Sequence, residues 1–442
     1  MRNQVKWLLC FTLIFASLQS LFVLPAAASE ESEEDPSTTA VAAASPLRPF
    51  PQHTAYVSGV IKPNHVNQTQ MDNEVKRLYD EWKGRYLKKN PYVSNQYFVH
   101  YNLNQESYDK DPTVVTTSEA NGYGMLITAI MAGYDSNAQT YFDGLYRFYK
   151  AHPSEINAQL MAWQQKDNGS AIVSNEDAGV NGATDGDMDI AYGLLLADKQ
   201  WGSSGSINYK SAAVQIINAI MASEVNQSAW HLKLGDWASD SSSKWGKGTR
   251  PSDYMLNHLR AFRAATGDGR WDTVLNQTYS IIQQLYTGYA GSTGLLPDFA
   301  TKESSGYKPA VGEYLETDKD GYYYYNASRT PWRIATDYIL TGDSRAKAQL
   351  TQLNNWIKGK TGSDPAKIKA GYRLNGNQIN SYYDLTFATP FAVSAMIDNS
   401  NQAWLNALWS NTTSKSTNSN TYFSNSIRLL SLITVSGNWW RP

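Results

Sequence analysis

Three aspartates at alternate positions, Asp185, Asp187 and Asp189, precede an apolar run with helical spacing that ends at Trp201. A helix N-terminus favours negative charge, so these acids could simply cap the helix, with Thr184 or Asp185 as the N-cap residue. A cap needs only one acid, however, and three carboxylates repel one another. We therefore expect a polyhydroxyl or cationic ligand to hold them.

A second helical segment supplies a candidate proton donor. Residues 118–125 read Ser-Glu-Ala-Asn-Gly-Tyr-Gly-Met, which places Glu119 in the first turn, where it could be the partner of a capping box. Gly122 and Gly124 follow inside the helix, where each costs up to about 1 kcal/mol. Such glycines permit close approach of a ligand or of another helix, and this favours a site around Glu119.

An arginine and a tyrosine flank a third helix start. Residues 249–254 read Thr-Arg-Pro-Ser-Asp-Tyr, and a proline followed by an acid is ordinary helix capping. Arg250 could then do no more than pair with Asp253. In the functional alternative, Arg250 and Tyr254 point into a cleft, where they bind hydroxyl groups or tune a carboxyl.

A fourth segment, residues 322–333, reads Tyr-Tyr-Tyr-Tyr-Asn-Ala-Ser-Arg-Thr-Pro-Trp-Arg. Asn326 could cap the helix that follows, with Trp332 buried in a core. Alternatively, Asn326 and Arg329 lie at the rim of the same cleft as the residues above. The sequence alone leaves both interpretations open.

Composition excludes several function classes. The formal net charge is only −2, so we expect neither a nucleic acid nor a membrane surface as partner. The six histidines show no metal-ligand spacing, and we expect no catalytic metal and no cofactor. Tryptophan (14) and tyrosine (29) are abundant, and their flat amphipathic faces suit sugars, although a large helical core would also use many of them.

The N-terminus has the pattern of a secreted protein. Arg2 and Lys6 precede an apolar run and small residues at 26–28, which predicts a signal peptide over residues 1–28. Residues 29–54 are acidic and rich in Ser, Thr, Ala and Pro, and we expect a disordered leader there. The single cysteine, Cys10, lies inside the signal, so the mature chain must be stabilised by its core rather than by disulfides.

The rest of the chain, residues 55–442, predicts one all-α domain. Apolar residues recur with helical spacing in blocks at 71–89, 118–133, 139–151, 184–199, 208–223, 251–266, 270–287, 328–341, 344–359, 385–398, 401–412 and 420–436. Twelve helices in sequential pairs suggest an (α/α)6 barrel, a toroid of six hairpins. One long inserted loop, residues 288–327, is poor in helix signals and rich in Gly and Tyr, and a loop of that length is usually functional.

The four segments, taken in order, resemble glycoside hydrolase family 8. The 183–201 segment is similar to the family signature, in which two aspartates two apart are followed by Ile-Ala and a terminal Trp, with Gly193 where Ser or Ala is usual. The resemblance implies an (α/α)6 barrel and an inverting endo-hydrolase of β-linked glucan, xylan or chitosan. By position, it makes Glu119 the general acid and Asp185 the residue that holds the sugar at the cleavage point.

The resemblance also directs the choice of base. In one branch of the family the base is an aspartate at the position of Asn326, and an amide cannot accept a proton. The chain therefore resembles the second branch, rich in chitosanases, in which a glutamate on an inserted loop is the base. We assign Glu316 to this role, with Glu313 as the reserve candidate and Glu303 behind it.

These assignments predict a secreted, monomeric inverting endo-chitosanase, with possible action on mixed-linkage β-1,3-1,4-glucan. Acids near 185–189 and 313–320 would match the ammonium groups of chitosan, so Asp187 is assigned to substrate binding. Trp163, Trp237 and Tyr254 are candidate stacking platforms, or else core residues. The alternatives are a β-glucanase without chitosanase activity and an inactive glycan-binding protein on the same fold.

Overall fold

The computed structural model describes residues 45–105, 110–177, 179–240 and 244–442. The predicted signal peptide lies outside these residues. The described residues belong to one compact unit. The described part contains twelve α-helices: α1 (Gln68–Tyr86), α2 (Ser118–Ile130), α3 (Ala138–Ala151), α4 (Thr184–Trp201), α5 (Tyr209–Ser223), α6 (Leu256–Thr266), α7 (Arg270–Tyr289), α8 (Thr330–Thr341), α9 (Ser344–Thr361), α10 (Leu385–Ala395), α11 (Gln402–Thr413) and α12 (Tyr422–Val435).

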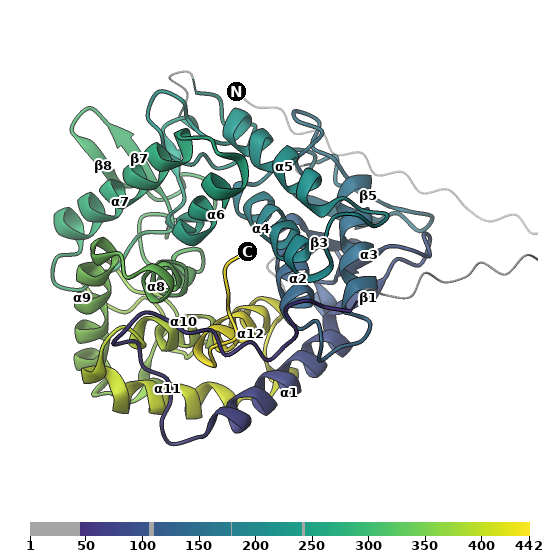
Figure 1. The fold of residues 1–442 in the computed structure, drawn as a ribbon. Coiled ribbons are helices and arrows are strands. Elements are labelled where there is room, and N and C mark those ends of the chain that lie inside the picture. The colour runs from purple at the N-terminus through teal and green to yellow at the C-terminus, as the bar shows by residue number, and fades with distance from the viewer. Residues whose placement is uncertain (1–44, 106–109, 178, 241–243) are drawn as a thin grey trace, which may run out of the picture. The chain divides into compact units, whose positions relative to one another are not determined.

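These helices form two concentric rings (Figure 1). The even-numbered helices α2 to α12 lie inside, where each packs against the next and α12 closes the ring against α2. Helices α3, α5, α7, α9 and α11 each cover the inner helix that precedes them, and α1 covers α12. This is the predicted (α/α)6 barrel. The C-terminal residues Trp439 and Trp440 are buried, and Trp439 stacks on Tyr192 of the inner ring.

Glycines explain why α2 and α4 pack so closely. A Cβ atom on Gly122 would lie 2.8 Å from Asp189 Cβ, and one on Gly186 would lie 2.4 Å from Ser118 Oγ. Gly193, which departs from the family signature, would bring its Cβ to 3.0 Å from Met125 Cβ. Close approach of another helix, rather than of a ligand, is thus what Gly122 permits.

The predicted helix 251–266 begins later than expected, because Pro251–Asp253 is a 3-10 turn ahead of α6. Short antiparallel strands decorate the ring: β1 (Leu87–Lys89) with β2 (Tyr97–Val99), β3 (Val114–Thr117) with β4 (Gln164–Asp167) and β5 (Ile172–Ser174), and β6 (Gly248–Thr249) with β7 (Ala300–Glu303) and β8 (Gly306–Pro309). The segment 288–327, expected as a loop, therefore contains a β-hairpin, β7–β8, that pairs with β6 just before Arg250.

The predicted leader extends too far toward the barrel. Residues 45–54 are described, and they pack on the helices instead of being disordered: Leu47 N donates to Gln200 O (2.8 Å) and Phe50 N to Ala132 O (2.7 Å). The Phe50 side chain is buried. Backbone hydrogen bonds and one apolar anchor hold this segment, which the polar composition of residues 29–50 did not indicate. Among the described residues, no helix is long and apolar enough to cross a membrane.

Candidate active site

The candidate site lies where the N-terminal ends of inner helices meet. Glu119 is in the first turn of α2, Asp185 is in the first turn of α4, and Arg329 immediately precedes α8. Tyr422, the first residue of α12, places its hydroxyl 3.4 Å from Glu119 Oε1. Because these helices begin at the same end of the ring, they gather residues that lie up to about 300 positions apart in the sequence.

Arg329 connects most of the site. Its Nη1 atom donates to Glu119 Oε2 (2.8 Å) and to Asp185 Oδ2 (2.9 Å). Its Nη2 atom donates to Ser252 Oγ (3.0 Å) and to Asn326 Oδ1 (2.9 Å). The guanidinium is almost fully buried, and its planar fork fixes these four partners relative to one another.

Glu119 has the properties of an acid that keeps its proton. Burial raises the pKa of Glu119 to about 7, against the opposing charge of Arg329 and with help from the negative charge of Asp185. Its side chain nevertheless keeps 16% of its surface exposed. The group is thus protonated in part near neutral pH and remains accessible to a ligand.

Asp185 is held as a carboxylate. Burial alone would raise the pKa of Asp185, but the charges of Arg250 and Arg329 outweigh this effect and lower it. Arg250 Nη1 lies 3.6 Å from Asp185 Oδ2. Protein cations, and not the polyhydroxyl or cationic ligand that we expected, therefore compensate this aspartate.

Glu316 lies on the other side of Arg329. Asn326 Nδ2 donates to Glu316 Oε2 (2.8 Å), and Arg250 Nη2 lies 3.7 Å from Glu316 Oε1. Loss of hydration raises the pKa of Glu316, while Arg250 and the Asn326 hydrogen bond oppose that rise. The side chain is 44% exposed, so a water molecule has room beside this carboxyl. Asn326 thus orients the glutamate that the sequence assigned as base.

A buried carboxylate fixes the Glu316 turn. Asp320 Oδ2 accepts hydrogen bonds from Leu315 N (2.7 Å) and Glu316 N (3.0 Å), and Oδ1 accepts one from Thr317 N (2.8 Å). Among the described residues, no hydrogen bond or ion pair joins the side chains of the other two candidate bases to Arg250, Asn326 or Arg329. Glu313 is exposed, and Glu303 of β7 lies 3.5 Å from Lys308 Nζ.

Helix geometry separates the three signature aspartates. Successive helical residues are about 100° apart, so Asp185 and Asp189 share one face, whereas Asp187 points the opposite way. Asp189 is fully buried and bonded to Arg333 (2.5 Å) and to His258 Nε2 (2.9 Å). Asp187 is also fully buried, and its Oδ1 accepts Met161 N (2.8 Å). The assignment of Asp187 to substrate binding is therefore wrong.

Of the three aromatic residues predicted to stack on sugars, the prediction for Tyr254 is wrong. This residue is fully buried in the main core, and no part of its ring is open to a ligand. Trp163 and Trp237 are partly exposed, and Trp237 packs edge-on against Trp245 with ring centroids 5.6 Å apart. Their role in stacking on sugars stays a prediction.

Two acids near the cluster were not singled out by the sequence. Asp253 is fully buried beside Arg250, and burial raises its pKa to about 7. Asp298 is buried behind Asn326 and accepts hydrogen bonds from Tyr324 N (2.9 Å) and Ala327 N (2.7 Å). Asp253 stands inside the matched Thr-Arg-Pro-Ser-Asp-Tyr segment, which was the available signal. Asp298 carries no local pattern that distinguishes it from other acids in its segment.

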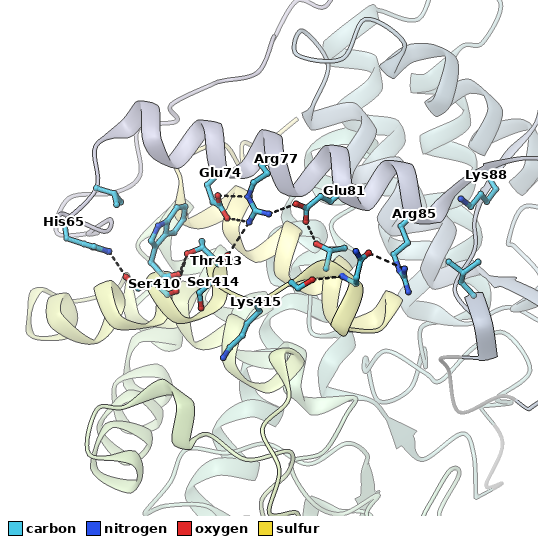
Figure 2. A pocket seen from close by; sticks show the side chains of 16 residues that line it. His65, Glu74, Arg77, Glu81, Arg85, Lys88, Ser410, Thr413, Ser414 and Lys415 are labelled. Carbon is cyan, nitrogen blue, oxygen red and sulfur yellow. Dashed lines mark hydrogen bonds and ion pairs between the residues drawn. The ribbon is translucent and has the colours of Figure 1, made fainter.

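A large groove elsewhere on the molecule is a separate feature (Figure 2). It encloses about 1100 Å³ between α1 and the segment around the end of α11, and none of the predicted site residues line it. Along its wall, Arg77 bonds to both Glu74 and Glu81. Arg85, Lys88 and Lys415 also line the groove, which therefore carries more basic than acidic side chains.

Comparisons with known proteins agree with this geometry. The model of "Glycosyl hydrolases family 8" matches residues 51–437. A β-glucanase from Niallia circulans is 56% identical over 397 residues, which cover 90% of this chain and 92% of the relative. The chain belongs to glycosyl hydrolase family 8. An endoglucanase from Bacillus sp. (strain KSM-330) is 42% identical, over 91% of this chain and 83% of the relative.

Solved family 8 structures extend the comparison. The apo structure of a β-1,3-1,4-glucanase from Paenibacillus sp. X4 superposes on this family 8 chain with a TM-score of 0.84 at 56% identity, covering 90% of this chain and 100% of that one. A cold-adapted family 8 xylanase has a TM-score of 0.69 at 19% identity, covering 84% and 92%. At that identity the second likeness shows the shared fold alone.

Proposed function

We propose that this glycoside hydrolase is a secreted endo-β-glucanase that cleaves mixed-linkage β-1,3-1,4-glucan with inversion of the anomeric centre. The observation that carries the proposal is the chain of hydrogen bonds that links Glu119 through Arg329 and Asn326 to Glu316 and so brings two carboxyls to one site. Inverting glycosidases need such a pair, with room for one water molecule between the base and the sugar.

In this mechanism Glu119 is the general acid. Its pKa of about 7 leaves a proton available, which passes to the glycosidic oxygen as the bond to the leaving sugar breaks. Glu316 is the general base and takes a proton from the water that attacks the anomeric carbon from the opposite face. Asp185, kept ionised by two arginines, is placed to bind hydroxyl groups of the sugar at the cleavage point.

The site favours a neutral polymer over chitosan. The acids at 185–189 were assigned to match ammonium groups, yet all three are buried and none is free: Asp185 and Asp189 are paired with arginines, and Asp187 faces away. Asp320 is committed to backbone amides. The names of the relatives, a β-glucanase, an endoglucanase and a β-1,3-1,4-glucanase, point in the same direction.

The test is hydrolysis of four polymers by the mature protein: barley mixed-linkage β-glucan, carboxymethyl-cellulose, xylan and chitosan, measured as release of reducing ends. We expect the highest kcat/KM on the mixed-linkage glucan. E119Q and E316Q controls, shown to be folded by circular dichroism, must lose the activity. Faster cleavage of chitosan than of glucan would overturn the substrate assignment, and no cleavage of any polymer would support an inactive glycan-binding protein instead.

A further inference from the structure

A second group of carboxyls lies on the opposite face of α4, and among the described residues no Lys, Arg or His forms an ion pair with it. Asp187 of α4 meets Glu224, which caps the C-terminus of α5, and Asp236 from the segment that follows. All three are buried, and Asp187 and Glu224 have no measurable exposure. Lys233, the nearby lysine in the sequence, directs its ammonium to Asp240 (2.9 Å).

Donors from the surrounding protein satisfy only part of this group. Asp236 accepts Gly182 N (2.9 Å) and Ser154 Oγ (2.5 Å), and Asp187 Oδ1 accepts Met161 N. The remaining Asp187 oxygen and both Glu224 oxygens receive no N–H or hydroxyl donor, although the two carboxyls lie close enough to each other for a hydrogen bond if one of them carries a proton. Two ionised carboxylates cannot bond in this way, and buried unpaired charge is costly.

We infer that Asp187 and Glu224 share one proton, with the Glu224 carboxylic acid donating to Asp187 Oδ2, and that this pair positions the backbone segments that carry Glu119 and Asp185. A proton supplies the donor that is missing and removes one of the two charges. The packing leaves little room for a larger group: a Cβ on Gly182 would lie 3.1 Å from Asp187 Oδ2 and 3.3 Å from Asp236 Oδ2. Among the described residues, no group of His, Cys, Asp and Glu has an arrangement that could hold a metal ion.

A series of hydrogen bonds connects Asp187 to the backbone beside Glu119. Asp187 fixes Met161, and two residues later Trp163 N donates to Asn181 O while Trp163 O accepts Ser118 N, both at 2.8 Å. Ser118 directly precedes Glu119. The pair therefore braces the backbone on which the proposed general acid stands.

The same group also braces Asp185. Asp236 binds the backbone of Gly182, and Thr184 Oγ1 donates to Lys233 O (2.8 Å), in the segment between Glu224 and Asp236. Asp185 follows Thr184 directly. The backbone positions of Glu119 and Asp185 thus both depend on one buried group.

Stability should depend on pH in a definite direction. Burial raises the pKa of Glu224 and of Asp187, and the charges of Asp236, Asp185 and Asp253 act in the same sense on one or both. Tyr149, from α3, also faces Asp187. A carboxyl whose folded pKa is raised stabilises the fold fully below its unfolded pKa, and this stabilisation is lost as pH rises toward the folded value.

The direct test is infrared spectroscopy of the intact protein at pH 7. The difference spectrum between wild type and E224Q should contain the C=O stretching band of a protonated, buried carboxylic acid. D187N, in which the new amide donates to an ionised Glu224, should lose the same band. Absence of this band from both difference spectra would overturn the proposal.

Thermal unfolding gives an independent measure. The glutamine of E224Q donates at every pH, so its unfolding midpoint should fall less steeply between pH 6 and pH 9 than that of wild type. E224A, which leaves Asp187 Oδ2 without a donor, should have a lower midpoint across the range. Should E224Q fail to fold, D187N takes its place. An unfolding midpoint that drops on treatment with EDTA and recovers with Ca²⁺ in wild type alone would show a cation in place of the proton, and would equally overturn the proposal.

The positioning claim rests on the proposed function and is tested by kcat. We expect E224Q to retain wild-type kcat on mixed-linkage glucan within about twofold at pH 6, and E224A to lose about tenfold or more with a smaller change in KM. Equal kcat values in E224A and wild type would refute positioning. The infrared band does not require any activity, so an inactive wild-type protein would refute the proposed function while leaving the shared proton to be judged by spectroscopy.

Discussion

Two sets of buried acids lie on opposite faces of the same helix, α4, and the protein stabilises them differently. Asp185 and Asp189 face arginines, Arg329 and Arg250 for the first and Arg333 for the second. Asp187 faces two further acids, Glu224 and Asp236, and in our account it shares one proton with Glu224. Arginine compensation keeps a carboxylate ionised and able to bind a ligand, whereas proton compensation produces a neutral structural brace. The contrast indicates which acids can serve chemistry.

The largest effect should come from removing Glu119, the acid that holds a proton and shares Arg329 with Asp185. E119Q keeps the shape of Glu119 and its hydrogen bond to Arg329, but it cannot donate a proton to the leaving group. We expect kcat on mixed-linkage glucan to fall about 10³-fold, equivalent to ~4 kcal/mol of transition-state stabilisation, with little change in KM. D318N, on an exposed acid of the same loop region as Glu316, serves as the control and should keep wild-type rates.

A matched pair of substitutions on α4 tests the comparison itself. D189N removes the charge that balances the buried Arg333 and should reduce the free energy of unfolding by about 3 kcal/mol. D187N replaces a carboxyl by an amide that still accepts Met161 N and donates to Glu224, so we expect a loss below ~1.5 kcal/mol. Chemical denaturation at pH 7 measures both. Equal losses would mean that the two faces of α4 are not compensated differently.

Disturbing the close packing of α2 against α4 should have a smaller effect on stability. G122A would place a methyl group 2.8 Å from Asp189 Cβ, and we expect it to cost about 2 kcal/mol in stability. Gly84, on the exposed side of α1, has no atom within 4 Å of the corresponding position. G84A should therefore stabilise the protein by ~0.5 kcal/mol through helix propensity. Thermal or urea unfolding of the two variants should give opposite signs.

The pH dependence of activity is the finest test. Glu119 must be protonated to act, and its pKa is about 7, so kcat/KM should fall as pH rises through 7. Arg329 opposes protonation of Glu119, so R329M should raise the Glu119 pKa and move this alkaline limb to higher pH, although kcat itself falls. Initial rates between pH 5 and pH 9 measure the alkaline limb of both wild type and R329M. If the alkaline limb of R329M lies at the same pH as that of wild type, the charge of Arg329 does not control the pKa of Glu119.

Much of this architecture is accessible from the sequence, because helical periodicity is a local property. The twelve predicted helices lie within a few residues of the observed ones, and the motifs contain Glu119, Asp185, Arg250, Asn326 and Arg329. Glu316 came from the resemblance to one branch of the family, and the structure joins it to the other five in one network. Position-by-position resemblance works here because each motif occupies the start of an inner helix or the turn before one.

What the sequence could not give is the direction in which a side chain points. Asp187 and Tyr254 lie inside the motifs, yet both face the core, since burial depends on neighbours that come from distant segments such as Glu224 for Asp187. The packing of residues 45–54 on the barrel is equally non-local, because its partners are Gln200, Ala132 and Asn438. The chitosan assignment depended in part on free acids at 185–189, and only the three-dimensional structure shows that these three are buried.

The stereochemistry of the first product tests the central claim most directly, namely that Glu119 and Glu316 act from opposite faces of the sugar. Proton NMR spectra recorded in the first minutes of mixed-linkage glucan hydrolysis report the anomer formed at the new reducing end, before mutarotation. Our account predicts the α-anomer from wild type and no early product from E316Q. The β-anomer as first product, or an E316Q enzyme that cleaves at the wild-type rate, would contradict it.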